Sequence, residues 1–178
     1  MPVPVQNLLI SGEGWRVRRA RVANAEFRRM LPEAEARSTW TVDDVRQAIE
    51  RHNANAVRWY AAGDVDSLVS IFAEDAWQMP PNSPPLVGRT AIRDFWRDAV
   101  RWGKWEFTLK TQTVDASGLM AVERGEYALR FTARASSPPG MSSFQDRGNY
   151  LVHWRQDSDK EWRVVADAPV SELPLQGA

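Results

Sequence analysis

Cysteine is absent from this chain of 178 residues, and histidine occurs only as His52 and His153. Without thiols the chain has no disulfides, no thiol nucleophile and no thiolate metal ligand. Two imidazoles are too few for a multi-histidine zinc site. No glycine pattern typical of nucleotide binding occurs either. The sequence therefore predicts neither a metal site nor a cofactor.

An excess of charge and a long apolar run are also missing. The 23 basic side chains balance 23 acidic ones, so there is no positive surplus to bind nucleic-acid phosphates. No apolar stretch approaches the roughly 20 residues of a membrane-spanning helix. The N-terminus lacks the continuous apolar stretch of a secretory signal. These absences argue against nucleic-acid and membrane partners and predict a cytoplasmic protein.

Tryptophan, in contrast, is abundant: the chain has nine, within a composition of 43% apolar and 26% charged residues. That overall composition is typical of a globular domain. Tryptophan combines the largest apolar side-chain area with one hydrogen-bond donor. Nine in a small domain indicate a large aromatic core, a pocket for a flat ligand, an apolar subunit interface, or a mixture of these.

The sequence divides into three parts. Residues 1–38 contain an arginine-rich stretch with helical spacing, which predicts an N-terminal arm that is partly ordered or forms one extra helix. A single domain is predicted over residues 39–174, and residues 175–178 are predicted to be a loose tail.

Helix signals come first within this domain. Thr41 is the expected N-cap of a helix that ends at Gly63, since glycine is the preferred C-terminal stop. Asp64 caps a shorter second helix, and Gly88 precedes a third that ends near Gly103. A short strand starting at Ala76 is expected between the second and third helices.

Beyond Gly103, apolar and polar residues alternate in four segments separated by turns. This period of two predicts antiparallel strands with one solvated face. Three helices followed by such strands are typical of an α+β fold. We therefore expect a curved antiparallel or mixed sheet wrapped around the three N-terminal helices.

Several short motifs occur in order between Thr41 and Pro174: Ala62-Gly63-Asp64, Phe72 to Ala76, Pro80-Pro81, Gly88-Arg89, Ala91-Ile92, Phe95-Trp96, Gly148 to Val152, and Trp162 to Val165. In this order they resemble the nuclear-transport-factor-2-like superfamily, which includes ketosteroid isomerase and the SnoaL-like polyketide cyclases. The chain is most similar to a branch with mostly uncharacterised members. The resemblance implies a cone-shaped, cystatin-like α+β barrel with a pocket between the first helix and the sheet. It also implies a homodimer through the convex sheet face.

The resemblance does not extend to the steroid-isomerase catalytic groups. Ketosteroid isomerase uses an aspartate base, a tyrosine and a protonated aspartic acid. When the shared motifs are aligned, the base position falls at Pro80, the tyrosine at Ala56 and the neutral acid at or beside Tyr150. Because proline cannot accept a proton, the sequence argues against steroid-isomerase chemistry by that mechanism.

Tyr150 and Asp167 are the candidate catalytic residues. The Tyr150 phenol, on an inward strand position, is placed to donate to a ligand carbonyl, or is a core tyrosine whose hydroxyl reaches the rim. Asp167 ends an apolar strand, where desolvation would raise its pKa and make it a general base. The alternative for Asp167 is a structural pair with an arginine such as Arg124 or Arg130.

The predicted ligand pocket lies between the first helix and the sheet. The amides of Asn53 and Gln78 either contact a ligand or form bonds to the sheet or to solvent. The tryptophans either stack on a planar ligand or belong to the core. His153 alternates out of phase with Tyr150 and should face the opposite side of the sheet. The expected lining residues are Asn53, Ala56, Trp59, Gln78, Pro80, Phe95, Val152 and Trp154.

The sequence therefore predicts a SnoaL-like protein that binds a small hydrophobic or aromatic ligand. Such a protein is a carrier or an isomerase-, cyclase- or lyase-like enzyme without the steroid-isomerase catalytic pair. The alternative is a non-catalytic homodimerisation or assembly module. An open cavity with converging polar groups favours the first prediction, whereas a cavity filled by Trp59, Phe95 and Trp154 favours the second.

Overall fold

The computed structural model describes residues 40–173, all of which belong to one unit, Glu35–Ala178. The predicted arm at residues 1–38 and the predicted tail at residues 175–178 lie outside the described residues. Between these limits the chain forms three helices, α2, α3 and α4, and one sheet of six strands.

Helix α2 (Val42–Ala62) begins and ends where the sequence predicts. The Thr41 hydroxyl accepts from the Asp44 N–H at 3.1 Å, and the Asp44 carboxylate accepts from the Thr41 N–H at 2.9 Å. This capping box satisfies two amide groups that a helix start leaves unpaired. Gly63 ends the helix in the left-handed conformation, with φ of 70°.

Helices α3 (Val65–Ser70) and α4 (Arg89–Trp102) also follow the predicted boundaries. The Asp64 carboxylate accepts from the Ser67 N–H at 3.1 Å and so caps α3. Gly88 precedes α4 with φ of 86°, a conformation that side chains other than glycine rarely adopt. One face of α4 is apolar and buried through Ile92, Trp96 and Ala99.

The sheet has the strand order β2-β1-β6-β5-β4-β3. All neighbouring strands are antiparallel except β1 and β6, which are parallel. Among the described residues nothing pairs β3 with β2, so the sheet is mixed and is not closed. The strands are β1 (Phe72–Gln78), β2 (Leu86–Val87), β3 (Gly103–Ser117), β4 (Met120–Ala133), β5 (Phe144–Gln156) and β6 (Trp162–Ser171).

The α+β prediction is therefore confirmed, with differences at the sheet edge. Strand β1 starts at Phe72 rather than Ala76, because its first residue pairs with Val164 of the distant strand β6. The short strand β2 was not predicted. Local alternation carries no sign of either feature, since both depend on contacts between remote segments.

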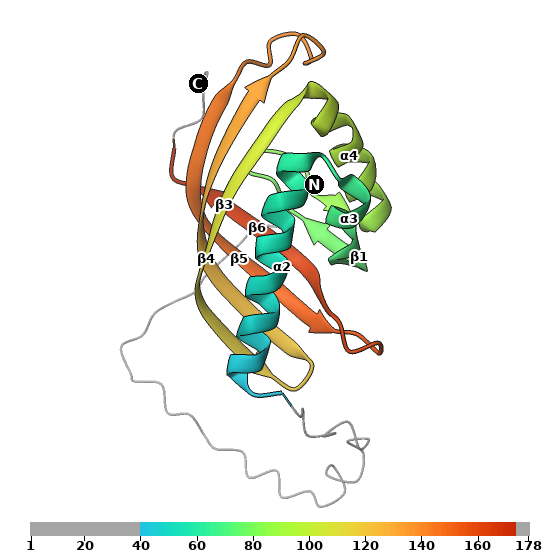
Figure 1. Ribbon diagram of the computed structural model, residues 1–178, viewed down its shortest axis with the longest axis vertical. Helices are drawn as coiled ribbons and strands as arrows, with labels where there is room; N and C mark the ends of the chain where they lie inside the picture. Colours follow the sequence, from blue (N-terminus) through green and yellow to red (C-terminus); the bar gives the residue numbers. More distant parts are fainter. Residues whose placement is uncertain (1–39, 174–178) are drawn as a thin grey trace, which may run out of the picture. The chain divides into compact units, whose positions relative to one another are not determined.

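The sheet curves, and α2 lies across one face of it, while α4 lies near β1 (Figure 1). Register shifts give β3 one extra residue between Thr111 and Thr113, and give β6 one extra residue, Val165, opposite His153 and Trp154. Such irregularities bend a strand and increase its twist. Within residues 40–173, no helix is long and apolar enough to cross a membrane.

Candidate functional site

A cavity of about 640 Å³ lies between α2, α4 and the face of the sheet that α2 crosses. Its size falls within the roughly 300–1,000 Å³ of small-molecule sites. Of the ten residues predicted for the pocket, nine line this cavity: Asn53, Ala56, Gln78, Pro80, Phe95, Tyr150, Val152, Trp154 and Asp167. Trp59 does not line it and packs against the core instead.

The residues that line the cavity differ widely in exposure. Asn82 and Ser83, in the loop after β1, are exposed and mark the mouth. Tyr150 and Trp154 are 7% and 1% exposed and mark the inner end. The cavity is therefore open to solvent at one end and is not filled by Phe95 and Trp154, which form part of its wall.

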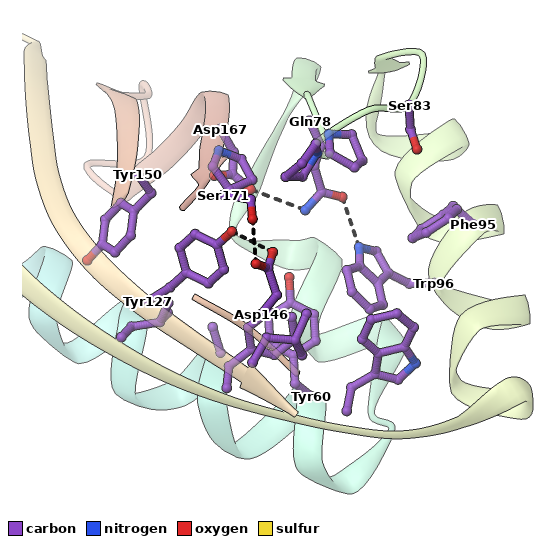
Figure 2. Close-up of a pocket in the computed structure, with 18 of the residues that line it drawn as sticks. Tyr60, Gln78, Ser83, Phe95, Trp96, Tyr127, Asp146, Tyr150, Asp167 and Ser171 are labelled. Carbon is purple, nitrogen blue, oxygen red and sulfur yellow. Dashed lines mark hydrogen bonds between the residues drawn. The ribbon is translucent and has the colours of Figure 1, made fainter. Parts of the chain in front are cut away.

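Asp167 projects from β6 between Gln78 of β1 and Val152 of β5, its partners in the sheet register. The Gln78 Nε2 atom donates to the Asp167 carboxylate at 3.2 Å, and the Trp96 Nε1 atom donates to the Gln78 Oε1 atom at 2.9 Å (Figure 2). The indole N–H thereby fixes which end of the Gln78 amide faces Asp167.

Burial raises the pKa of Asp167 to about 6. The hydrogen bond from Gln78 lowers that pKa, and the negative charge of Glu123 raises it. A carboxyl group with a pKa near the working pH is suited to accept and return a proton.

The alternative that Asp167 pairs with Arg124 or Arg130 is wrong. Both arginines are exposed, and Arg124 donates to the Thr113 hydroxyl at 3.0 Å. The two arginines alternate with the buried residues of β4, which places them on the opposite face of the sheet from Asp167. Asp167 therefore faces the cavity with an amide, not a cation, as its hydrogen-bond partner.

Tyr60 is a lining residue that the sequence analysis missed. Its ring lies 4.6 Å from the ring of Trp96 and 4.3 Å from that of Phe107. Burial raises the pKa of the Tyr60 phenol, the charge of Asp167 raises it further, and a hydrogen bond with Gln78 opposes the change. The phenol therefore stays protonated at neutral pH. Its place on the buried stripe of α2, one turn after Ala56, was the available signal.

The Tyr150 hydroxyl donates a hydrogen bond to Glu123, which is fully buried behind the cavity wall. One Glu123 oxygen accepts from the Tyr150 hydroxyl at 2.8 Å and the Asn53 amide at 2.7 Å. The same oxygen accepts from the Thr111 hydroxyl at 2.7 Å, and the other accepts from the Trp154 indole at 3.1 Å. Burial and the Glu123 charge raise the pKa of Tyr150. The predicted lining residues Asn53, Tyr150 and Trp154 thus share one buried partner.

A second carboxylate, Asp146 of β5, also lines the cavity. One of its oxygens accepts from the Tyr127 hydroxyl at 2.7 Å, and the other accepts from the Ser171 hydroxyl at 2.6 Å (Figure 2). Neither Asp146 nor its partners were predicted from the sequence, because Asp146 sits in a polar run at the start of β5.

The two histidines lie outside the cavity lining. His52 stacks behind Trp154 with ring centres 5.6 Å apart, and burial lowers its pKa. His153 pairs in register with Ala166, out of phase with Tyr150 as the sequence predicts. No group of three or more potential metal-ligating side chains gathers anywhere within residues 40–173.

Comparison of the sequence with family models gives one match: the model of the SnoaL-like domain matches residues 54–163. A search of curated proteins finds no significant match.

Solved structures with the same fold are numerous, and three illustrate it. A candidate scytalone dehydratase from Novosphingobium aromaticivorans is 16% identical, with a TM-score of 0.65 over 74% of this chain and 87% of that one. A ketosteroid isomerase-like protein from Erwinia carotovora atroseptica is 16% identical, with a TM-score of 0.61 over 72% and 96%. A nuclear-transport-factor-2-like protein with a cystatin-like fold, also from N. aromaticivorans, is 20% identical, with a TM-score of 0.58 over 75% and 83%. At these identities the likeness establishes the fold alone.

Proposed function

Since the chain belongs to the SnoaL-like domain family, we propose that it binds a hydrophobic, ring-containing small molecule in the cavity and transfers a proton on it. Asp167 is the general base in this proposal. The observation that carries the proposal is a cavity-facing carboxyl whose pKa is raised to about 6 and whose hydrogen-bond partner is an amide.

The reaction needs no co-reactant. Asp167 takes the proton from a carbon next to a carbonyl group, and the electron pair of the broken C–H bond forms an enolate. The Tyr60 phenol, which stays protonated because burial raises its pKa, donates to the developing oxyanion. Asp167 then returns the proton to the same carbon or to a conjugated one, which completes an isomerisation with no change in oxidation state.

Tyr150 has a different part in this proposal. Its hydroxyl donates to Glu123 at 2.8 Å, so its proton is already used when a ligand enters. The apolar ring of Tyr150 contacts the ligand, and the hydroxyl fixes the inner wall. Among the phenols that line the cavity, Tyr60 supports the donor role better, since its hydroxyl shares Gln78 with the base.

Hydrogen exchange at carbon tests the proposal without knowledge of the natural substrate. A panel of cyclic ketones fused to aromatic rings, such as α-tetralones, is incubated with the protein in D₂O, and deuterium uptake next to the carbonyl is followed by NMR. We expect uptake above the buffer rate with the wild type and with Asp115→Asn, which removes an exposed carboxylate elsewhere. Asp167→Asn should reduce uptake to the buffer rate. Equal rates for the wild type and Asp167→Asn would refute the role of Asp167.

Dimerisation is the second candidate, and it is compatible with a working cavity. Trp77 and Leu151 are each 46% exposed and Val170 is 64% exposed. Each of them alternates out of phase with a cavity-facing residue of its own strand, so all three lie on the face opposite the cavity. An exposed apolar strip of this kind is typical of an interface.

Sedimentation velocity tests the dimer directly. We expect the wild type to sediment as a dimer and Leu151→Asp to sediment as a monomer. Leu119→Asp, which changes an equally apolar and 52% exposed side chain at the β3–β4 turn, is the matched control and should leave the dimer intact. A monomeric wild type would remove this second candidate.

A further inference from the structure

The charged side chains that line the cavity all have one sign. Of the lining residues, which lie within residues 40–173, the ionisable carboxylates are Asp146 and Asp167, and none is lysine, arginine or histidine. Glu123 adds a third carboxylate directly behind the inner wall. A low-dielectric cavity with carboxylates on its walls concentrates a negative potential in its interior.

Basic residues near the cavity do not offset these carboxylates. Arg147 follows Asp146 in the sequence, but its side chain is 70% exposed and its guanidinium pairs with Glu172 at 3.9 Å. His52 lies behind Trp154 and is neutral at pH 7, because burial lowers its pKa. The negative potential inside the cavity therefore has no internal cation to balance it.

Donor groups of the wall are largely occupied by acceptors of the protein. The indoles of Trp96, Trp105 and Trp154 donate to Gln78, to the Ala99 carbonyl and to Glu123 respectively. The hydroxyls of Tyr127 and Tyr150 donate to Asp146 and Glu123. A carboxylate or phosphate ligand would thus meet no lining cation, and the Tyr60 phenol alone would compensate little of its desolvation.

Aromatic rings form much of the rest of the cavity wall. The cavity is lined by the aromatic rings of Phe95, Trp102, Trp105, Phe107 and Phe144, and Tyr60 lies close enough to Asp167 for the aspartate charge to add to burial in raising the Tyr60 pKa. Aromatic faces attract cations through their quadrupole, most strongly where water is excluded. The combination of aromatic faces with carboxylates that have no cationic partner is complementary to an organic cation.

We propose that the ligand of this cavity is a hydrophobic amine that binds in its protonated form, with the ammonium group held by Asp146 and the aromatic rings. Asp146 anchors the charge because its oxygens already accept from Tyr127 and Ser171, which hold the carboxylate in place on the cavity wall. Asp167, with Gln78 as its partner, stays available for proton transfer. The inference rests on the proposed function, since it names the ligand class of the same cavity.

A matched series of three probes tests the charge preference: 2-(1-naphthyl)ethylamine, 2-(1-naphthyl)ethanol and 1-naphthylacetate, which are cationic, neutral and anionic versions of one skeleton. Binding to the full chain is measured at pH 7.5 by quenching of tryptophan fluorescence. We expect the amine to bind at least about tenfold more tightly than the alcohol, and the carboxylate to bind more weakly than either. The advantage of the amine should shrink as salt is added.

Two variants test whether Asp146 is the residue that binds the ammonium group. Asp146→Asn should reduce the preference for the amine over the alcohol to about threefold or less while affinity for the alcohol changes little. Asp115→Asn, which removes one exposed carboxylate elsewhere, should leave the preference unchanged. Circular dichroism of each variant checks that the fold is kept.

The possible outcomes separate the two proposals. Equal affinity for the amine and the alcohol, or tightest binding of the carboxylate, overturns the amine inference and leaves the hydrophobic pocket intact. An amine preference that Asp146→Asn does not alter also overturns the stated anchor. Failure of all three probes to bind at millimolar concentration overturns the ligand pocket and, with it, the inference.

Discussion

Glu123 and Asp167 are both carboxylates on the inner side of the same sheet, yet their surroundings differ. Glu123 is fully buried and accepts from an amide, two hydroxyls and an indole. Asp167 lines the cavity and accepts from the Gln78 amide. The first carboxylate is saturated with donors, whereas the second is desolvated with little compensation, so its pKa rises to about 6.

This difference indicates that one carboxylate of the fold has a structural role and the other is suited to proton transfer. The Glu123 carboxylate, with its four donors, joins helix α2 to strands β3, β4 and β5. A carboxylate with an amide partner and an open cavity beside it is able to exchange its proton with a ligand. The number of donors, and not the residue type, distinguishes the two sites.

The largest expected effect is on the saturated carboxylate. Glu123→Leu leaves the donors of Asn53, Tyr150 and Trp154 buried without an acceptor, so we expect a loss of about 4 kcal/mol in the free energy of unfolding. Urea denaturation followed by tryptophan fluorescence measures it. Glu126→Leu, at an exposed position on the same strand, is the control and should change stability by about 0.5 kcal/mol or less. A loss below about 1 kcal/mol for Glu123→Leu would show that the cluster is not a structural tie.

The second effect has the opposite sign. Asp167→Asn removes a carboxyl whose folded-state pKa of about 6 lies above its ordinary value of 3.8. The folded state therefore holds this proton more tightly, and the wild type loses stability as the pH rises from 3.8 to about 6. We expect Asp167→Asn to be more stable than the wild type at pH 7.5 by on the order of 2 kcal/mol. Urea unfolding at several pH values should show this advantage fade toward pH 4.

A variant that is no more stable than the wild type at pH 7.5 would mean that Asp167 carries no desolvation penalty. In that case the contrast with Glu123 would disappear.

The third prediction concerns the Gln78 amide, whose orientation beside Asp167 depends on Trp96. Trp96→Phe removes the N–H that holds the Gln78 amide, so the donor to Asp167 loses its fixed orientation. We expect the pKa of Asp167 to rise further, and stability to fall by about 1 kcal/mol. The pH profile of the ketone exchange rate should move to higher pH by the same amount. Trp105→Phe, whose indole donates to the Ala99 carbonyl instead, should leave the profile in place.

The smallest expected effect separates the two tyrosines. Tyr150→Phe removes one of the four donors to Glu123 and should cost about 1 kcal/mol of stability while leaving the ketone exchange rate near that of the wild type. Tyr60→Phe should instead slow the exchange. Exchange assays of the two variants side by side check this, and a slower rate for Tyr150→Phe alone would return the donor role to Tyr150.

Much of the fold was predictable because its signals are local. The Thr41 cap, the stops at Gly63 and Gly103, and the alternation after Gly103 depend on near neighbours, and all reappear in the structure. The parallel pairing of β1 with β6 and the short strand β2 do not, because they join segments far apart in the sequence.

The site was predictable only in part, for a similar reason. Alternation placed Tyr150, Val152 and Trp154 on the cavity side, but it did not reveal their shared partner. Glu123 lies between Val122 and Arg124 in a stretch with several charged residues and resembles a solvated residue, although it alternates in phase with buried Tyr127. Gly125, between Glu123 and Tyr127, was the available sequence signal. A side chain at this position would overlap the Tyr150 phenol, so Tyr150 can reach Glu123 only if residue 125 is a glycine.

The most direct test of the contrast is a ¹³C NMR titration of the aspartate side-chain carboxyl carbons. We expect one aspartate signal with a midpoint near pH 6, absent in Asp167→Asn and unaffected by Asp115→Asn. A spectrum in which Asp167 titrates at the ordinary value of 3.8 would contradict the account, because a carboxyl with that pKa would not be the desolvated base that the cavity requires.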